Sequence, residues 1–530
     1  MRMKQVPAAA VIAVVSVVAG AAIGARPVQT QDQLAARYAI FQAAVAAVRD
    51  QYVEPTDGGT AVYGAIDGML LQLDPHSNFL DPNEYRRMRE TQVGTYKGIG
   101  ISILPVDGNI VVTRLFENSP AYRAGIRRND MLARVGKEEV TATWSTQDVV
   151  DRVRGPKGTT VDISIRRPGV SQLIDLTVER DDIKITTVTA AFIAAPGTGY
   201  VRMQDFSETT DAELGDALTR LKAAGMQRLV LDLRDNLGGP LDQAIAVSSR
   251  FLKRGQLVVY TRGRVKGADE EYHVGEPGNT ELPLVVMVNR NSASASEIVS
   301  GAMQDHDRGL IVGETSFGKA LVQGVYRISE NAALALTTGR YYTPSGRLIQ
   351  RPWDGAFDEY ITYGLRDQKA ERSHNAADLK YTDSGRKVYG GGGIEPDHFV
   401  AGSVEGFEPS RFSRMLRDRG TFIQFNERFT KDGDARAGSR SSAKYKVAPD
   451  WTVTDAQLAE FKEFVAGQRV RMDAKAFTAD QAFLKAMIKF EVDTDLFGVE
   501  VARRNLAKAD PQLQAALGLF EDARKLLARR

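Results

Sequence analysis

The spacing of apolar residues changes along the chain and divides it into regions. From Asp32 to Tyr52 and from Thr60 to Leu73, apolar side chains recur at intervals of three and four, which predicts amphipathic helices. Short β-like segments follow up to about residue 182, and they predict a compact module of roughly five or six strands with two helices. Between residues 183 and 397 the strands become continuous apolar runs separated by helical segments.

These continuous strands predict a largely buried sheet with α/β crossovers. They include "RLVLDLR" (228–234), "PLVVMVN" (283–289) and "GLIVGE" (309–314). The last region is patterned as charged helix and carries no motif. We therefore predict a multidomain α/β and β protein with a helical N-terminal segment (33–90), an inserted short-stranded module (93–182), an α/β core (183–397) and a mainly helical C-terminal extension (398–530).

The composition excludes several function classes. At 530 residues the chain is too long for one hydrophobic core, and its 43% hydrophobic and 26% charged residues are ordinary for globular domains. The net charge of +2 gives no electrostatic footprint for nucleic acid. Because the chain has no cysteine, disulfides, thiolate metal sites and a cysteine nucleophile are excluded.

The N-terminus predicts export. Arg2 and Lys4 precede an uncharged apolar run from Val6 to Ala25, which is long enough to span a bilayer. Residues 1–26 therefore fit a cleaved signal peptide or an uncleaved membrane anchor equally well. We expect the rest of the chain to work outside the cytoplasm, in the periplasm or cell envelope.

Lys319, in "GETSFGKALVQ" (313–323), fits three chemistries. A phosphate-binding loop requires Ser or Thr after the lysine, where this chain has Ala320. Ser316 and Lys319 also form the S-x-x-K of penicillin-recognising enzymes, although the companion S-D-N and K-T-G elements are absent. In the third hypothesis Lys319 is the base for a serine elsewhere, with burial lowering its pKa toward neutrality.

"NSASASE" (291–297) offers such a serine, because it joins a buried strand to a helix. This layout exposes a nucleophile and aims helix N–H groups at a reacting carbonyl. Alternatively, the stretch is only a capped helix start, with Glu297 three residues after Ser294 as a capping box. A second strand, "LVLDLRDNLGG" (229–239), ends in two glycines whose N–H groups suit an oxyanion hole or, equally, a plain turn.

Histidine and metal chemistry are disfavoured. Of the five histidines, His306 is the one near the serine turn in sequence, and its position at a helix end favours a solvated or capping role. "EEYHVGE" (270–276) could supply metal ligands through Glu271, His273 and Glu276, but it reads as an exposed loop. We predict no metal and no cofactor.

Several motifs occur together in one order: "LDPHSNFLDPNEY" (73–85), "GIGI" (98–101), "LDLRDNLGG" (231–239), "NSASASEIVSGAMQDH" (291–306), "GETSFGK" (313–319) and "GGGGIEPD" (390–397). Over residues 33 to 397 the chain resembles the C-terminal processing (tail-specific) serine peptidases. The resemblance implies Ser294 as nucleophile, Lys319 as general base, Gln323 as the residue that orients the lysine, and an oxyanion hole from the N–H groups of Gly239 and Ala295.

The resemblance also implies a PDZ domain over residues 93–182. Its loop Gly98, Ile99, Gly100 and Ile101 would hold the terminal carboxylate of a protein substrate with an accessible apolar tail. A catalytically silent PDZ scaffold and a penicillin-recognising enzyme using Ser316 are the alternative functions. A homo-oligomer, an adaptor partner, and a membrane contact through an uncleaved N-terminus stay open.

Two positions depart from this pattern. Ala320 stands where the family more often has glycine. Asn129 also stands where a glycine is usual, and asparagine tolerates that position if its φ is positive.

In one extended strand Lys319 and Gln323 would lie about 13 Å apart. They can meet only if the chain bends after Gly318 or the two side chains converge.

Chelators and thiol reagents should have no direct effect on hydrolysis, because the chain has no cysteine and no predicted metal cluster. The measurement is the rate of peptide cleavage with EDTA and, separately, with a maleimide. Inhibition by EDTA that added Zn²⁺ reverses would show instead that Glu271, His273 and Glu276 bind a metal.

Overall fold

The computed structural model describes residues 31–529 apart from 107, 117, 354–356, 367, 369–372, 435–442 and 469. The predicted signal or anchor, residues 1–26, lies outside them. The chain forms two compact units: one runs to Asp81 and includes Val325–Leu336, and the other holds the remaining residues. None of the described helices is long and apolar enough to cross a membrane.

The first unit contains the two helices that the apolar spacing predicts. Helix α2 (Gln31–Gln51) is followed by α3 (Gly58–Leu70), which Asp57 caps by accepting two backbone N–H groups. Strand β1 (Asn78–Leu80) pairs antiparallel with the first residues of β18 (Ala333–Tyr342).

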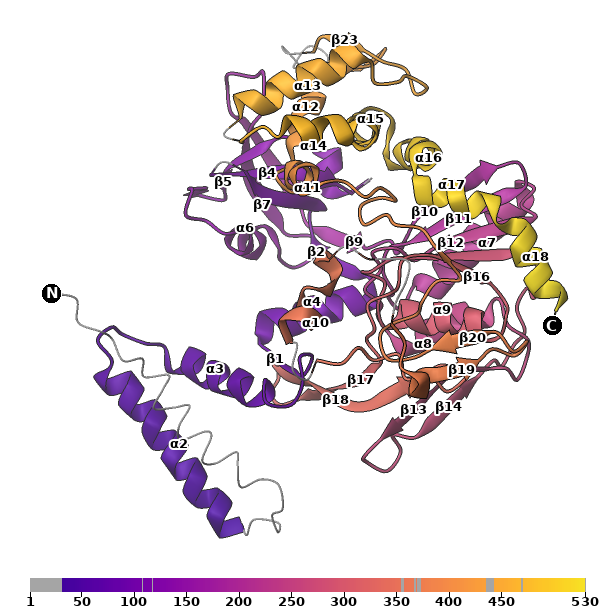
Figure 1. The fold of residues 1–530 in the computed structure, drawn as a ribbon. Coiled ribbons are helices and arrows are strands. Elements are labelled where there is room, and N and C mark those ends of the chain that lie inside the picture. The colour runs from indigo at the N-terminus through magenta and orange to yellow at the C-terminus, as the bar shows by residue number, and fades with distance from the viewer. Residues whose placement is uncertain are drawn as a thin grey trace. The chain divides into compact units, whose positions relative to one another are not determined.

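The second unit begins with α4 (Pro82–Val93) and the short-stranded module (Figure 1). Strands β2 (Thr95–Gly98) and β9 (Asp181–Lys184) pair antiparallel where the chain enters and leaves the module. In the described residues its sheet has the order β3-β4-β5-β7-β8, with β6 beside β5, so β3 is an edge strand. The bounds are β3 (Ile101–Val106), β4 (Asn109–Leu115), β5 (Met131–Val135), β6 (Glu138–Glu139), β7 (Thr160–Arg166), β8 (Ile174–Glu179), α5 (Pro120–Arg123) and α6 (Thr146–Val153).

The core is a sheet of order β10-β11-β12-β15-β16-β21, in which only the β10–β11 pair is antiparallel. Its central strands are buried apart from Arg228 at the start of β12, as their continuous apolar sequences predict. The bounds are β10 (Val188–Ala195), β11 (Thr198–Met203), β12 (Arg228–Asp232), β15 (Leu284–Val288), β16 (Leu310–Gly313) and β21 (His398–Phe399).

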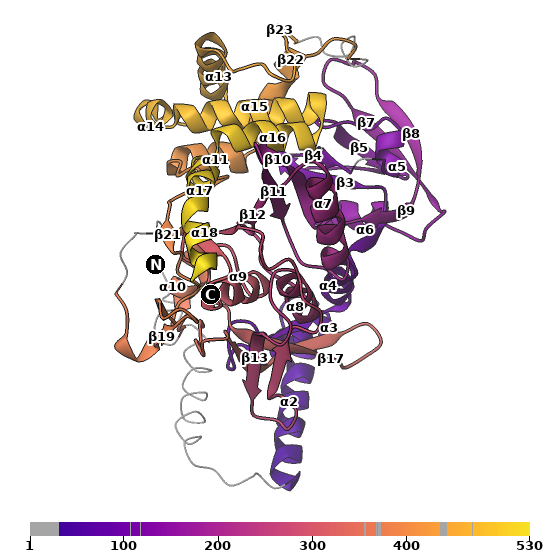
Figure 2. The same ribbon diagram turned by 90° about the vertical axis from the view of Figure 1, so that its right-hand side faces the viewer.

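Helices cover both faces of this sheet (Figures 1 and 2). The crossover helices α7 (Thr210–Ala223), α8 (Leu241–Ser249) and α9 (Ala295–Asp305) pack on one face. The strand order advances in one direction, and right-handed crossovers then place successive helices on the same side. The opposite face packs against the last helices of the chain, α16 (Val499–Ala509), α17 (Pro511–Gly518) and α18 (Phe520–Ala528).

A smaller antiparallel layer lies beside the core. Strands β13 (Leu257–Gly263) and β14 (Glu270–His273) pair with each other, and β13 also pairs with the end of β18. Strand β17 (Leu321–Arg327) pairs with β18. The remaining elements of this region are α10 (Phe357–Ile361), β19 (Leu379–Tyr381) and β20 (Lys387–Tyr389).

We call residues 404–529 the C-terminal module. It has an aromatic core of its own around Phe422, Phe425 and Phe461. It also contacts the short-stranded module, where Arg128 pairs with Glu491 and Asn129 donates to Asn426 Oδ1 at 3.0 Å. Besides α16–α18 it contains α11 (Arg411–Asp418), α12 (Thr421–Phe425), β22 (Phe429–Thr430), β23 (Tyr445–Lys446), α13 (Asp455–Gly467), α14 (Ala474–Ala479) and α15 (Gln481–Phe497).

Candidate active site

Ser294 lies in a strained turn between a buried strand and a helix. Strand β15 ends at Val288, the serine turn covers residues 289–294, and α9 begins at Ala295. Ser294 has φ 54° and ψ −112°, which non-glycine residues seldom adopt without a functional reason. Its side chain is half-buried, whereas Ser292 and Ser296 are fully buried. Ser294 is therefore the serine of this turn that a substrate could reach.

Lys319 and Gln323 are in contact. Lys319 Nζ donates to Gln323 Oε1 at 2.9 Å. Lys319 precedes strand β17, which begins at Leu321, so the two residues do not lie in one extended strand. The 13 Å separation expected for one extended strand therefore does not apply. Ala320 is fully buried, and its N–H donates to Gln350 Oε1 at 2.8 Å.

The carboxylate of Glu297 joins the serine turn to residues 316–319, which we call the lysine loop. It accepts the N–H of Ser294 at 2.8 Å, the N–H of Gly318 at 2.6 Å and the N–H of Lys319 at 2.9 Å. The hydroxyl of Ser316 donates to it at 2.6 Å. The capping box expected from the sequence is present, but its acid also fixes the backbone of the lysine.

Glu297 is fully buried, and this burial raises its pKa to about 7. The hydrogen bonds from Ser316, Lys319, Ser294 and Gly318 oppose the shift. With a pKa of about 7 the Glu297 carboxyl group changes its charge near neutral pH, and its ionised form accepts hydrogen bonds from all four donors.

The two glycines at the end of "LDLRDNLGG" lie against the serine turn. We call residues 233–239 the glycine loop. A Cβ on Gly238 would stand 2.8 Å from both Ser294 Cβ and Ala295 N, and a Cβ on Gly239 would overlap Phe206. Ala295 is the first residue of α9, so its N–H has no acceptor within the helix. The Gly238 N–H donates to Asn236 Oδ1 at 2.9 Å, so the glycine loop and the first turn of α9 lie against each other beside Ser294.

Ser316 is not placed to act as a nucleophile. It is fully buried, donates to Glu297, and accepts the N–H of Ile394 at 2.6 Å. The segment from Ser316 to Lys319 is not helical, unlike the S-x-x-K element. The geometry therefore favours Ser294 over Ser316.

His306 has a structural position. It is buried at the end of α9, with Nδ1 2.8 Å from Asp383 Oδ2 and Nε2 2.7 Å from the carbonyl oxygen of Leu257. Of the two predicted roles, capping and solvated, His306 has the capping one, since it is buried at the C-cap of α9. Glu271 and His273 lie on the exposed strand β14 and not in a loop. No group of three or more potential metal ligands occurs among the described residues.

Sequence reasoning did not identify a buried ionic network at the end of β12. Asp232 accepts from Arg234 Nε at 2.9 Å and from Tyr200 at 2.6 Å, and pairs with Arg202 at 3.3 Å. Burial alone would raise the pKa of Asp232, but Arg234 and Arg202 hold it at about 2. Charged residues within the apolar run "LVLDLR" were the available signal, because buried charges require partners.

The segment Gly98–Ile101 connects β2 to the edge strand β3. Gly100 has φ +83°, and a Cβ there would crowd Ser119. The carbonyl oxygens of Ile99 and Gly100 accept the N–H groups of Ala121 and Phe116. Helix α6 contacts β3, so an edge strand and a helix flank the predicted carboxylate loop. Asn129 has φ 68°, the positive value its position requires.

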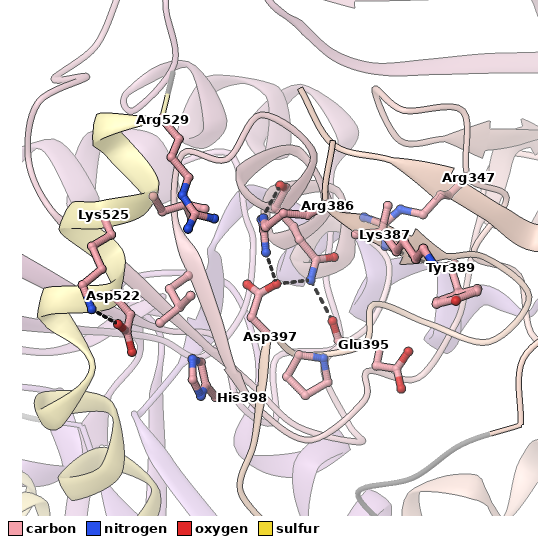
Figure 3. Close-up of a pocket in the computed structure, with 15 residues that line it drawn as sticks. Arg347, Arg386, Lys387, Tyr389, Glu395, Asp397, His398, Asp522, Lys525 and Arg529 are labelled. Atoms are coloured by element: carbon pink, nitrogen blue, oxygen red, sulfur yellow. Dashed lines mark hydrogen bonds and ion pairs between the residues drawn. The ribbon is translucent and has the colours of Figure 1, made fainter. Parts of the chain in front are cut away.

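A pocket of about 460 Å³ lies elsewhere in the second unit, between β20, β21 and α18 (Figure 3). Arg386 and Lys387 line one side, and Lys525 and Arg529 line the other. Arg386 is held by Asp397 and Asp307. None of the predicted catalytic residues lines this pocket.

Comparison of the chain with known proteins assigns it to a family. The model of peptidase family S41 matches residues 197–355, and the PDZ domain model matches residues 111–167. A carboxy-terminal-processing protease of Bartonella bacilliformis is 39% identical over 308 residues, covering 57% of this chain and 70% of the relative. The chain belongs to peptidase family S41. It is a carboxy-terminal-processing protease with a PDZ domain, and the predicted multidomain α/β fold is confirmed.

The chain is also similar to two further processing proteases. The carboxy-terminal processing protease CtpA of Bacillus subtilis is 30% identical over 386 residues, covering 73% of this chain and 77% of the relative. A solved photosystem II D1 C-terminal processing protease is 31% identical and covers 60% of this chain and 90% of its own, with a TM-score of 0.33.

Replacing Glu297 by Gln should lower kcat by about ten- to a hundredfold, because a carboxamide turns one acceptor into a donor that faces the N–H groups of the site.

The replacement of Glu297 by Gln should also flatten the pH dependence of the free energy of unfolding. Since the folded-state pKa lies above its ordinary value of 4.5, the wild type loses stability as pH rises from about 4.5 to about 7. That loss amounts to about 3 kcal/mol.

The measurements are peptide hydrolysis and thermal melting of both proteins at pH 5 and pH 8. Equal kcat values, or an unchanged pH dependence of melting in the variant, would contradict the role assigned to the Glu297 carboxylate.

Proposed function

We propose that the chain is a serine endopeptidase that uses a Ser–Lys dyad. Neutral Lys319 takes the proton of the Ser294 hydroxyl as Oγ attacks the scissile carbonyl. The N–H groups of Gly239 and Ala295 stabilise the oxyanion, and the Lys319 ammonium then gives its proton to the leaving amine. Water hydrolyses the acyl-enzyme by the same steps, with Lys319 again as base.

The observation that supports this proposal is that hydrogen bonds tie the backbone of Ser294 to that of Lys319, and the Lys319 side chain to Gln323. Glu297 accepts from the backbone of both Ser294 and Lys319, and Gln323 holds Lys319 Nζ through an acceptor. A neutral partner such as the Gln323 amide orients the amine without the stabilisation of the ammonium that a carboxylate would provide. This arrangement suits a lysine that has to act as a base.

We further propose that the PDZ domain recognises the substrate tail. The tail would pair with the edge strand β3, and the Gly98–Ile101 loop would take its carboxylate on backbone N–H groups. Substrates would then be proteins with accessible apolar C-termini, cut upstream of the bound tail. The apolar N-terminal run supports work outside the cytoplasm, in the periplasm or cell envelope.

Ser294→Ala and Lys319→Ala should each abolish peptide hydrolysis while the protein stays folded. Lys319→Arg should be equally inactive, because a guanidinium group does not release its proton at working pH. The measurement is cleavage of a fluorogenic peptide, with circular dichroism to confirm folding.

Ser316→Ala is the matched control, since it removes one bond to Glu297 but no reacting group. This variant should keep measurable peptidase activity. Wild type and variant should give the same result with a fluorescent penicillin, because Ser316 is not expected to react with it. Activity in Ser294→Ala together with its loss in Ser316→Ala would move the nucleophile to Ser316.

Amidating the C-terminus of a tailed substrate should lower kcat/KM by roughly ten- to a hundredfold. The amide lacks the charge that strengthens hydrogen bonds to the carboxylate loop. The measurement compares free-acid and amidated forms of one protein substrate. Equal rates would remove tail recognition and leave a general serine–lysine peptidase.

A further inference from the structure

The C-terminal module reaches a buried arginine beside the proposed active site. Arg234 Nη2 lies 2.6 Å from Asp510 Oδ2, and Arg234 Nη1 donates to Gln512 Oε1 at 3.0 Å. Arg234 is 2% exposed and Asp510 is 3% exposed, so water screens this pair little. Asp510 is therefore a principal partner of the Arg234 charge on the side of the C-terminal module.

Within the core, the carboxylate partner of Arg234 is Asp232, which Arg234 shares with a second arginine. Asp232 bonds Arg234 and also faces the buried guanidinium of Arg202. Arg202 also pairs with Glu405 and Asp235, but without Asp510 the Arg234 guanidinium would be left with Asp232 as its carboxylate partner in the described residues. Breaking one member of a buried charge network leaves the remaining charges undercompensated.

The Arg234–Asp510 pair is enclosed by a tight turn of the C-terminal module. Gly406 has φ +83°, and a Cβ there would overlap the Asp510 carboxylate and stand 2.9 Å from Arg234 Nη1. The preceding residue, Glu405, also has a positive φ of 50°. The backbone thus approaches the ion pair as closely as glycine allows.

Arg234 belongs to the glycine loop, which is bonded to the serine turn. Ser292 Oγ donates to the carbonyl of Leu233 at 2.8 Å, and the N–H of Ala293 donates to the carbonyl of Asn236 at 3.0 Å. The same carbonyl accepts from Ser296 Oγ at 2.9 Å. Arg234 therefore lies between two loop carbonyls, those of Leu233 and Asn236, that are bonded to the serine turn.

We propose that Asp510 is a positioning residue for the peptidase site. Its carboxylate fixes Arg234, and through the glycine loop it sets the Gly239 N–H against Ser294. This inference rests on the proposed function and extends it. It makes the C-terminal module, which lies outside the matched S41 region of residues 197–355, part of the catalytic unit.

The test is Asp510→Asn in the full chain. Asp510 also caps α17 by accepting the N–H of Leu513 at 3.0 Å, and asparagine caps a helix equally well, so the change removes the charge and spares the cap. For a short unstructured peptide we expect kcat to fall about ten- to a hundredfold with KM within about threefold. The rate of Ser294 labelling by a fluorophosphonate should fall in parallel.

The matched control is Asp493→Asn. Asp493 is fully buried in the same module, where it bonds Trp451, Lys489 and Asn505, and it has no contact with Arg234 in the described structure. This variant should melt at a lower temperature yet keep kcat within about twofold. The double variant Asp510→Asn, Gln512→Glu returns a negative charge to Arg234 and should recover part of the lost kcat, with Gln512→Glu alone as the control for the lost bond from Gln512 Nε2 to the Val400 carbonyl.

Three results would overturn the inference: an unchanged kcat in Asp510→Asn, an equal loss of kcat in Asp493→Asn, or no recovery in the double variant. If Asp510→Asn does not fold, Asp510→Ser keeps a capping oxygen without the charge and takes its place under the same criteria. A wild type that neither cleaves peptide nor labels at Ser294 would instead refute the proposed function itself.

Discussion

The candidate active site depends on one buried carboxylate. Glu297 accepts hydrogen bonds from the serine turn and from the lysine loop, two segments separated along the chain by strand β16. Burying this group has a cost, which the rise of its pKa to about 7 expresses, and the four donated bonds offset that cost. The Glu297 side chain therefore fixes the backbone of Ser294 and Lys319 relative to each other, which is the preorganisation that the proposed proton transfer between them requires.

The sheet beneath the site imposes a second constraint. Its crossover helices all pack on one face, and a mainly parallel sheet has to be covered on both. Helices α16–α18 cover the opposite face and bring Asp510 to the end of β12. The C-terminal extension is thus part of the core of this peptidase, although its sequence carries no catalytic motif.

Much of this could be predicted from the sequence because local patterns determine it. Continuous apolar strands indicated the buried sheet, and the "SASAS" turn with Lys319 indicated the site. The Lys319–Gln323 contact could not be derived from strand spacing, since Lys319 lies outside strand β17 and the two side chains converge. The double role of Glu297 and the pairing of Arg234 with Asp510 join residues that are distant along the chain, so no local pattern reports them.

The most direct test of the proposed mechanism is an experimental structure of the chain after reaction with a peptide aldehyde. We predict a covalent bond to Ser294 Oγ, with the hemiacetal oxygen about 3 Å from the nitrogen atoms of Gly239 and Ala295. Lys319 Nζ should lie within hydrogen-bonding reach of Oγ while still bonded to Gln323. A bond to any other residue, or an oxygen that points away from both N–H groups, would contradict the mechanism.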